Sequence, residues 1–194
     1  MERLVLRELA RSAPTPVARA VLCMRVYGDV RGSQRMDVHI SHIRSKLAAT
    51  GLRIPPAPRG GAYALVQRGA AVCLAEDHAG LARALRSELE RAVSASVEVK
   101  ATFAEARASV ERRECDVVVA DVVLGSKPLG VELAAIAKAN GIAAILISGS
   151  ERFAANAFDM DVPFLLKPFT ATTLCTLVPS ALAECALKRA GGGR

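Results

Sequence analysis

Two features that place proteins in membranes are missing from this sequence. Its 194 residues contain no stretch of about 18 consecutive apolar residues, the length that a transmembrane helix needs. The first residues, Met1–Leu4, do not begin the charged segment, apolar segment and cleavage site of a secretory signal. The sequence therefore indicates a cytoplasmic protein without a membrane partner.

Paired cysteines are also missing. The five cysteines stand singly, none belongs to a CxxC pair, and no histidine lies at metal-ligand spacing from any of them. Cysteines of this kind usually serve as small buried apolar residues in a reducing compartment. The spacing argues against a zinc site and predicts free, buried thiols at Cys23, Cys73, Cys115, Cys175 and Cys185.

Positive charge is concentrated at one end of the chain, whose net charge is +7. Residues 1–69 contain 12 Arg and Lys and 4 Asp and Glu, which gives 12 − 4 = +8. Residues 70–194 contain 14 basic and 15 acidic residues, which gives 14 − 15 = −1. A basic half beside a near-neutral half predicts that one domain meets a polyanion and the other does not.

The hydrophobic pattern changes near residues 67–70. Upstream, short helical segments alternate with proline and glycine turns, and one helix is predicted from Pro16, with Thr15 as its N-cap, to about Val26. Downstream, five short apolar runs alternate with five amphipathic stretches, which is typical of a parallel sheet covered by helices on both faces. The runs are Ala71–Ala75, Val97–Ala101, Val117–Ala120, Ala143–Ile147 and Phe164–Leu166.

This pattern predicts an α/β protein with two domains. We expect a small basic domain at residues 1–68, a doubly wound five-stranded parallel sheet at residues 71–187 and a flexible tail at residues 188–194. Functional residues gather at the carboxyl ends of the strands in such a sheet. The strand ends carry, in chain order, Glu76 and Asp77, Asp121, Ser148, and Lys167.

Each of these residue types has a role in phosphoryl chemistry. Three carboxylates repel one another unless a hard divalent cation such as Mg²⁺ relieves the repulsion. A carboxylate can attack a phosphorus centre when a metal and a lysine neutralise the developing charge. A hydroxyl can hydrogen-bond a phosphoryl oxygen, and the small Gly149 leaves room for phosphate to approach. The pattern predicts Mg²⁺-dependent phosphoryl acceptance.

These motifs resemble those of the CheY-like receiver domains of bacterial response regulators, over about residues 71–187. The resemblance implies a flavodoxin-like fold in which Asp121 is the phospho-acceptor and Ser148 and Lys167 contact the phosphoryl group. It further implies that Phe164 is the aromatic switch residue, and that the peptide bond after Lys167 is cis.

The same resemblance implies the metal ligands. Asp77 and Asp121 would bind Mg²⁺ directly, Glu76 would act mostly through water, and the backbone carbonyl of Val123 would be a further ligand.

The segment after the acceptor differs from that of common receivers. They place a proline four residues after the acceptor and a glycine eight after it, whereas this chain has Gly125 at the first place and Gly130 nine residues after. Metal-dependent phosphatases with a similar sheet place a second aspartate two residues after the nucleophile, where this chain has Val123. The sequence therefore favours a phosphoryl-accepting regulator, which is not an enzyme in the turnover sense, over a phosphatase.

In the basic half, a helix predicted to begin near Ser33 has two neighbouring stripes. Apolar residues recur at intervals of four, three and four residues, at Met36, Ile40, Ile43 and Leu47. Basic and hydrogen-bonding side chains recur beside them, as a helix in the DNA major groove requires. The predicted DNA contacts on this helix are Arg35, His39, His42 and Lys46, with Arg44 on the other flank within reach of a phosphate.

Residues 53–66 are predicted to form a β-hairpin with Arg59, another predicted DNA contact, near its tip. This helix and hairpin resemble the recognition helix and wing of OmpR/PhoB-type winged-helix effector domains. The four-stranded sheet that usually opens that domain does not precede the first helix, and the domain order is inverted. A basic helical domain that binds a protein instead of DNA is the alternative.

The two resemblances together imply a two-component response regulator. A histidine kinase or phosphotransfer protein would phosphorylate Asp121, and the short linker near residues 67–70 would pass the change to DNA binding and transcription. The last predicted helix, Thr170–Leu187, has no charged residue up to Ala183. It has an apolar stripe instead, and part of that stripe must cover the sheet. We also expect a homodimer with a hydrophobic contact between receiver domains. The stripe consists of Leu174, Leu177, Val178 and Leu182.

Overall fold

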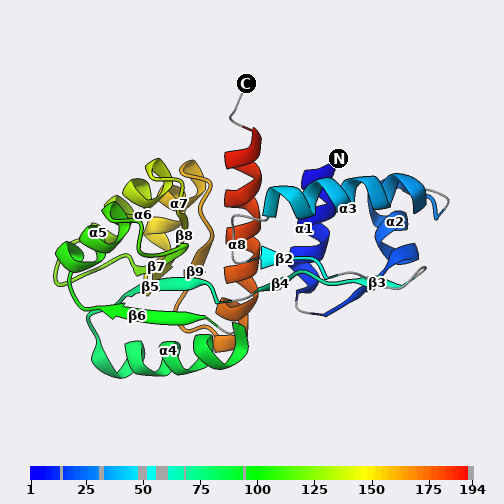
Figure 1. Ribbon diagram of the computed structural model, residues 1–194. Coiled ribbons are helices and arrows are strands. Elements are labelled where there is room, and N and C mark those ends of the chain that lie inside the picture. The colour runs from blue at the N-terminus through cyan, green and yellow to red at the C-terminus, as the bar shows by residue number, and fades with distance from the viewer. Residues whose placement is uncertain are drawn as a thin grey trace.

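The computed structural model describes residues 1–13, 15–30, 33–47, 52–55, 61–67, 69–93 and 95–191. A helical N-terminal part lies on one side, and a sheet with its covering helices lies on the other (Figure 1). A long helix, α8 (Ala171–Gly191), stands between them. Within the described part of the chain, no helix is both long and apolar enough to cross a membrane.

In its described residues, the N-terminal part has three helices and two pairs of short antiparallel strands. Its elements are α1 (Glu2–Ser12), β1 (Val17–Ala18), α2 (Arg19–Tyr27), α3 (Ser33–Leu47), β2 (Leu52–Arg53), β3 (Ala62–Tyr63) and β4 (Val66–Gln67). Strand β1 pairs with β3, and β2 pairs with β4. The β2–β4 pairing confirms the base of the predicted hairpin, whereas Arg59 lies outside the described residues.

The helix predicted from Pro16 begins later than expected. Val17 lies opposite Tyr63 in the β1–β3 pair, and the backbone N–H of Arg19 donates to the carbonyl of Gly61. This pairing holds residues 17–18 extended, so α2 starts at Arg19 and Thr15 is not its cap. The predicted end is confirmed, because Gly28 follows the helix with a φ of 70°, a conformation that glycine adopts without strain.

Helix α3 matches its prediction, and its apolar stripe is buried. Met36, Ile40, Ile43 and Leu47 belong to the hydrophobic core. On its other side, Asp37 accepts a 2.5 Å hydrogen bond from the Tyr63 hydroxyl and also binds the Arg19 guanidinium. Burial and this bond raise the pKa of Tyr63 to about 12. Asp37 therefore joins α2, α3 and β3.

The second part is the predicted doubly wound sheet. Its elements are β5 (Ala71–Ala75), α4 (Ala79–Val93), β6 (Ser96–Lys100), α5 (Phe103–Glu111), β7 (Val117–Asp121), α6 (Leu129–Ala139), β8 (Ala143–Ser148), a 3-10 turn (Glu151–Phe153), α7 (Ala154–Asp159) and β9 (Phe164–Leu166), followed by α8. All neighbouring strands are parallel, in the order β6-β5-β7-β8-β9. The predicted α/β fold with a five-stranded parallel sheet is confirmed.

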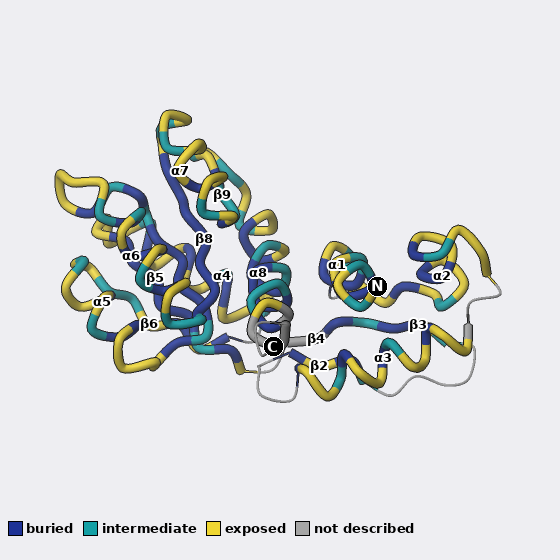
Figure 2. The backbone as a smooth tube through the Cα atoms, turned by 90° about the horizontal axis from the view of Figure 1, so that it is seen from above, coloured by how far each residue is buried: buried dark blue, intermediate teal, exposed yellow. Residues whose placement is uncertain are grey.

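The sheet buries both faces because its strands are apolar throughout. Along β7, Val117 and Val119 belong to one core, while Val118 and Ala120 belong to the other. Helices α4 and α8 contribute to the first core, and α5 and α6 contribute to the second. Figure 2 shows strand β8 dark along its length, as expected for a central parallel strand.

Helix α8 joins the two parts through a shared core. Leu174 and Val178 on α8 belong to the same buried cluster as Leu6 and Leu9 on α1. Helices α1 and α3 and strand β2 all contact α8. The expectation that part of the apolar stripe covers the sheet is confirmed, and the N-terminal part covers it as well. The stripe is therefore not available as the predicted homodimer contact.

The C-terminal tail also begins later than predicted. Residues 188–191 continue α8, and Lys188 makes a 2.5 Å ion pair with Asp161, which follows α7. Residues 192–194 lie outside the described residues.

The shared core predicts that the chain unfolds as one unit. Replacing Leu6, which is fully buried, by Ala should lower the free energy of unfolding by about 2–5 kcal/mol. Val21→Ala, at an exposed apolar position on α2, should change it by less than about 0.5 kcal/mol. Urea unfolding, followed by circular dichroism and by hydrogen exchange in each part, would measure both. Two separate transitions, with only the first shifted by Leu6→Ala, would contradict a shared core.

Candidate phosphoryl-acceptor site

Side chains from the ends of three strands meet at a single lysine. The Nζ atom of Lys167, after β9, lies 2.5 Å from Oδ2 of Asp121 and 3.0 Å from Oε2 of Glu76. Glu76, after β5, is only 2% exposed, so its charge needs a buried partner. Burial lowers the pKa of Lys167, but hydrogen bonds to Asp121 and Glu76 outweigh it and raise the pKa overall. The lysine is therefore held as an ammonium ion against two carboxylates.

A hydrogen bond joins the loop after β7 to Asp77, the acidic residue that follows Glu76. The backbone N–H of Gly125 donates a 2.9 Å hydrogen bond to Oδ2 of Asp77, and Gly125 has a φ of 66°. A proline, the residue common in receivers at this place, could neither donate that bond nor adopt that φ. The departure noted in the sequence thus has a structural reason. Asp121 also accepts a hydrogen bond, 3.1 Å long, from the backbone N–H of Val123.

The remaining predicted side chains flank the same edge of the sheet. Ser148 ends β8, beside β7, and its buried hydroxyl accepts a 3.1 Å hydrogen bond from the backbone N–H of Ser150. The backbone N–H of Lys167 donates to the Ser148 carbonyl at 2.7 Å, and the peptide bond after Lys167 is cis, as predicted. Phe164 is partly buried against the core formed with α5 and α6.

Two glycines near Asp121 and Ser148 differ sharply in their surroundings. A Cβ on Gly130 would lie 2.0 Å from the carbonyl oxygen of Asp121, so the start of α6 can approach the backbone of Asp121 only because Gly130 has no side chain. A Cβ on Gly149 would meet no atom within 4 Å. The first glycine is needed for packing, and the second leaves open space beside Ser148.

The carboxylates offer hard oxygen atoms of the kind that Mg²⁺ prefers. Both carboxylate oxygens of Glu76 already have partners in the protein. Oε1 accepts a hydrogen bond from the backbone N–H of His78, and Oε2 binds Lys167. Asp77 is exposed and Asp121 is partly exposed, so these two fit a metal best. Among the described residues, no three His, Cys, Asp or Glu side chains are grouped closely enough to hold a metal ion by themselves.

The predicted DNA-contact residues of α3 have partners within the protein. The Nδ1 atom of His42 lies 3.0 Å from Oε1 of Glu2, and the Nζ atom of Lys46 lies 2.5 Å from Oε2 of the same residue. The hydrogen bond from Lys46 lowers the pKa of Glu2. Sequence reasoning missed Glu2, because no local pattern links residues forty positions apart.

The other predicted DNA-contact residues of α3 do not pair with Glu2. Arg44 donates hydrogen bonds of 2.8 and 2.7 Å to the carbonyls of Ile54 and Pro55, and so holds the base of the hairpin. Arg35 is exposed, with its guanidinium 5.3 Å from the centre of the Tyr27 ring. His39 is half-buried beside the same ring.

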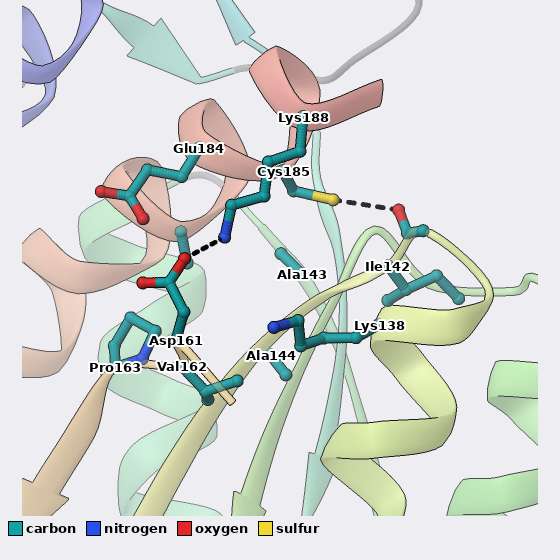
Figure 3. Close-up of a pocket in the computed structure, with 12 residues that line it drawn as sticks. Lys138, Ile142, Ala143, Ala144, Asp161, Val162, Pro163, Glu184, Cys185 and Lys188 are labelled. Atoms are coloured by element: carbon teal, nitrogen blue, oxygen red, sulfur yellow. Dashed lines mark hydrogen bonds and ion pairs between the residues drawn. The ribbon is translucent and has the colours of Figure 1, made fainter. Parts of the chain in front are cut away.

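A small cleft lies at the opposite edge of the sheet from Asp121, where β8 begins. Its volume is about 240 Å³, and Lys138, Ala143, Asp161, Cys185 and Lys188 help to line it. Figure 3 shows the Lys188–Asp161 ion pair and the hydrogen bond from the Cys185 thiol to a backbone carbonyl closing it from two sides. These contacts fasten α8 to the sheet and are separate from the carboxylate site.

Comparison of the fold with solved structures identifies the class of the second part. The receiver protein of a response regulator from Sinorhizobium medicae is 27% identical, with a TM-score of 0.55, and covers 60% of this chain and 97% of its own. The signal receiver domain of a modulated diguanylate cyclase from Desulfovibrio desulfuricans is 27% identical, with a TM-score of 0.54, and covers 62% and 98%. The parallel-sheet part has the receiver fold.

A third receiver-containing neighbour shares the fold alone. The DNA-binding response regulator of the LuxR family from Staphylococcus aureus is 18% identical, with a TM-score of 0.53, and covers 58% of this chain and 98% of its own. No protein-family model and no curated protein matches the sequence. Because these matches take in nearly the whole of each neighbour, roughly two fifths of this chain has no counterpart in them.

The two glycines give a matched pair of substitutions. Gly130→Ala should destabilise the receiver part by about 1–3 kcal/mol, because the new methyl group collides with backbone. Gly149→Ala should change the free energy of unfolding by less than about 0.5 kcal/mol. Thermal and urea unfolding of the two variants would measure this difference. Equal stability of the two would show that α6 does not approach Asp121 as closely as described.

Proposed function

We propose that the protein is a two-component response regulator that accepts a phosphoryl group on Asp121 from a histidine kinase or a phosphotransfer protein. The observation that carries this proposal is the Lys167 ammonium bound to both Asp121 and Glu76 at the carboxyl edge of a receiver-fold sheet. That edge is where parallel α/β sheets place their reactive groups.

The reaction is an in-line displacement at phosphorus. An oxygen of Asp121 attacks the phosphoryl group, the new O–P bond forms, and the bond from phosphorus to the donor's imidazole nitrogen breaks. Lys167 neutralises charge on the transferred oxygens, and the Ser148 hydroxyl donates a hydrogen bond to one of them. Asp77, Asp121 and the Val123 carbonyl would hold Mg²⁺, which would supply further positive charge.

Glu76 acts through Lys167 and not on the phosphoryl group. Its buried carboxylate holds the ammonium at the acceptor before the donor arrives, which keeps the side chain in place. Water later hydrolyses the acyl phosphate and restores the carboxylate, so the receiver resets without a second protein. The phosphoryl group adds roughly −1.5 to −2 charge beside Lys167.

We also propose that α8 carries the change to the N-terminal part. Lys167 lies four residues before α8, and α8 contacts α1, α3 and β2. When Lys167 and Ser148 move toward a phosphoryl group, Phe164 fills the space behind Ser148. This movement changes the packing of the sheet against α8. The N-terminal part then changes its affinity for its target.

DNA is the first candidate for that target. The order of elements from α1 to β4, with paired strands before and after the two central helices, is compatible with a winged helix that lacks its opening sheet. The +8 charge of residues 1–69 suits duplex DNA. We propose Arg35, His39, His42, Lys46 and Arg59 as its contacts, with Arg44 supporting the hairpin. A homodimer that places two such parts on DNA would use a surface other than the buried stripe of α8.

A protein partner is the second candidate, and the Glu2 contacts favour it. Glu2 occupies both His42 and Lys46, which leaves the predicted DNA face partly neutralised. A phospho-regulated interaction module would need no free basic stripe on α3.

Phosphorylation is tested with a small phosphodonor and Mg²⁺. Asp121→Asn should abolish incorporation of phosphate while leaving the fold intact, and Asp77→Ala should reduce it strongly by weakening Mg²⁺ binding. Asp159→Asn, an exposed position at the end of α7, is the control for loss of one carboxylate. Intact-protein mass spectrometry measures the adduct. Full phosphorylation of the Asp121→Asn variant would contradict the assignment of Asp121 as the acceptor.

The choice between DNA and protein is tested with two substitutions on α1. Glu2→Gln should strengthen binding to duplex DNA and steepen its dependence on salt by about one counterion, because it frees Lys46 for a phosphate. Glu8→Gln makes the same charge change where the carboxylate pairs with Arg11 and Arg25 instead. Fluorescence anisotropy across salt concentrations compares them. Identical effects of the two, or no DNA binding by either, would favour the protein-interaction module.

A further inference from the structure

A cleft lies between the N-terminal part and the receiver part, where α1 runs beside α8 (Figure 1). Its volume is about 390 Å³, within the range of roughly 300–1,000 Å³ that is usual for small-molecule sites. Leu6, Ala10 and Ala183 give it an apolar floor, and each of them is fully buried. We call it the α1–α8 cleft.

Charged side chains from three segments line the walls of this cleft. Arg3 and Arg7 come from α1, Glu184 and Lys188 come from α8, and Asp161 follows α7. The two residues from each helix are four positions apart and therefore lie on one face of that helix. Asp161, Glu184 and Lys188 also line the smaller cleft at the start of β8, so the two clefts are neighbours.

Two of these side chains neutralise each other. Lys188 and Asp161 form a 2.5 Å ion pair, and this contact, with a smaller contribution from Lys138, lowers the pKa of Asp161. The backbone at Asp161 has a φ of 51°, a left-handed conformation that aspartate tolerates better than most residues. The pair therefore forms one end of the cleft and leaves no net charge there.

The other three charged side chains have no partner within the described part of the chain. Arg3, Arg7 and Glu184 make no ion pair or side-chain hydrogen bond with any described residue. The remaining charged residues of α1 all form ion pairs, and these are Glu2, Glu8 and Arg11. The unpaired charges of α1 are thus the two that line the cleft.

These unpaired charges are unfavourable without a ligand. Arg3 and Arg7 carry like charges one turn apart on α1, and such charges repel each other. Glu184 is half-buried, so its carboxylate is only partly solvated by water. A molecule with the opposite charges would relieve both costs.

We propose that the α1–α8 cleft binds an acidic amino acid, a molecule with two carboxylates and one ammonium group. The planar guanidinium groups of Arg3 and Arg7 suit carboxylates, because each can donate two parallel hydrogen bonds to one. The Glu184 carboxylate accepts hydrogen bonds from the ammonium group. The inference rests on the lining of the cleft and does not depend on phosphorylation of Asp121 or on DNA binding.

Glu184 decides the chemical class of the ligand. A phosphate or a simple dicarboxylate would bring negative charge next to the carboxylates of Glu184 and Asp161, and these charges repel at close range. A neutral amino acid has a single carboxylate and would leave one of the two arginines unpaired. An acidic amino acid matches all three unpaired side chains.

A ligand in this cleft would contact both parts of the protein. Arg3 and Arg7 belong to the N-terminal part, whereas Glu184 lies on α8, which packs on the sheet. Because the ligand binds the folded chain and bridges its two parts, it stabilises their packing. The cleft is therefore a site at which a small metabolite can bias the contact between α1 and α8.

Ligand binding is tested on the full-length protein at constant ionic strength. L-Glutamate and L-aspartate are compared with glutarate, which lacks the ammonium group, and with L-glutamine, which lacks one carboxylate. At about ten times its Kd, at least one acidic amino acid should raise Tm by about 2–4 °C. Glutarate and L-glutamine should bind at least about tenfold more weakly in calorimetric titrations. No saturable binding of either acidic amino acid, or equal binding of glutarate, would overturn the proposal.

Substitutions test the roles of the walls. Arg7→Gln should weaken binding of the acidic amino acid by at least about tenfold. Arg11→Gln is the matched control, because Arg11 lies on the same helix, pairs with Glu8 and does not line the cleft. It should leave the affinity unchanged, and equal weakening by both variants would overturn the assignment of Arg7.

Glu184→Gln should act in opposite directions on two ligands. It should weaken binding of the acidic amino acid, because the ammonium group loses its partner, and strengthen binding of glutarate, because a repulsion is removed. Circular dichroism verifies the fold of each variant, and the comparison of ligands on the unaltered protein stands by itself. An unchanged ratio of the two affinities would overturn the role of Glu184 and with it the ligand class.

Discussion

A single buried ion pair network organises the receiver part of this protein. Lys167 places one ammonium against Glu76 and Asp121, which come from strands far apart in the sequence. A carboxylate as buried as Glu76 is costly without a partner, and the lysine removes that cost. Because Glu76 follows β5, Asp121 ends β7 and Lys167 follows β9, their pairing also fixes the ends of these strands relative to one another.

Helix α8 extends that organisation to the rest of the chain. It begins four residues after Lys167, covers one face of the sheet and buries its other side against α1, α3 and β2. The result is one hydrophobic core that runs from Val5 in the N-terminal part to Val119 in the sheet. Such a core leaves little independent motion between the two parts. A shift at one end of α8 therefore displaces the residues packed along the helix.

Much of this architecture could be predicted from the sequence, because parallel strands buried on both faces are apolar along their whole length. The bounds of β5 and β9 and the cis bond after Lys167 match the expectations. Contacts between distant segments could not be predicted. The Glu2 pair with Lys46 and the contact of α8 with α1 depend on how distant segments pack, for which the sequence carries no local signal. The early residues of α2 were misjudged because a two-residue strand pairing overrode a good helix-capping pattern.

The central claim of this account is that the state of Asp121 is communicated through α8 to the N-terminal part. Hydrogen–deuterium exchange of the full chain, with and without Mg²⁺ and beryllofluoride as a phosphoryl mimic, tests it most directly. The account predicts altered exchange in α1 and α8 as well as in the loops after β7 and β8, with no such change in the Asp121→Asn variant. Changes confined to those two loops, with α1 and α8 unaffected, would contradict it.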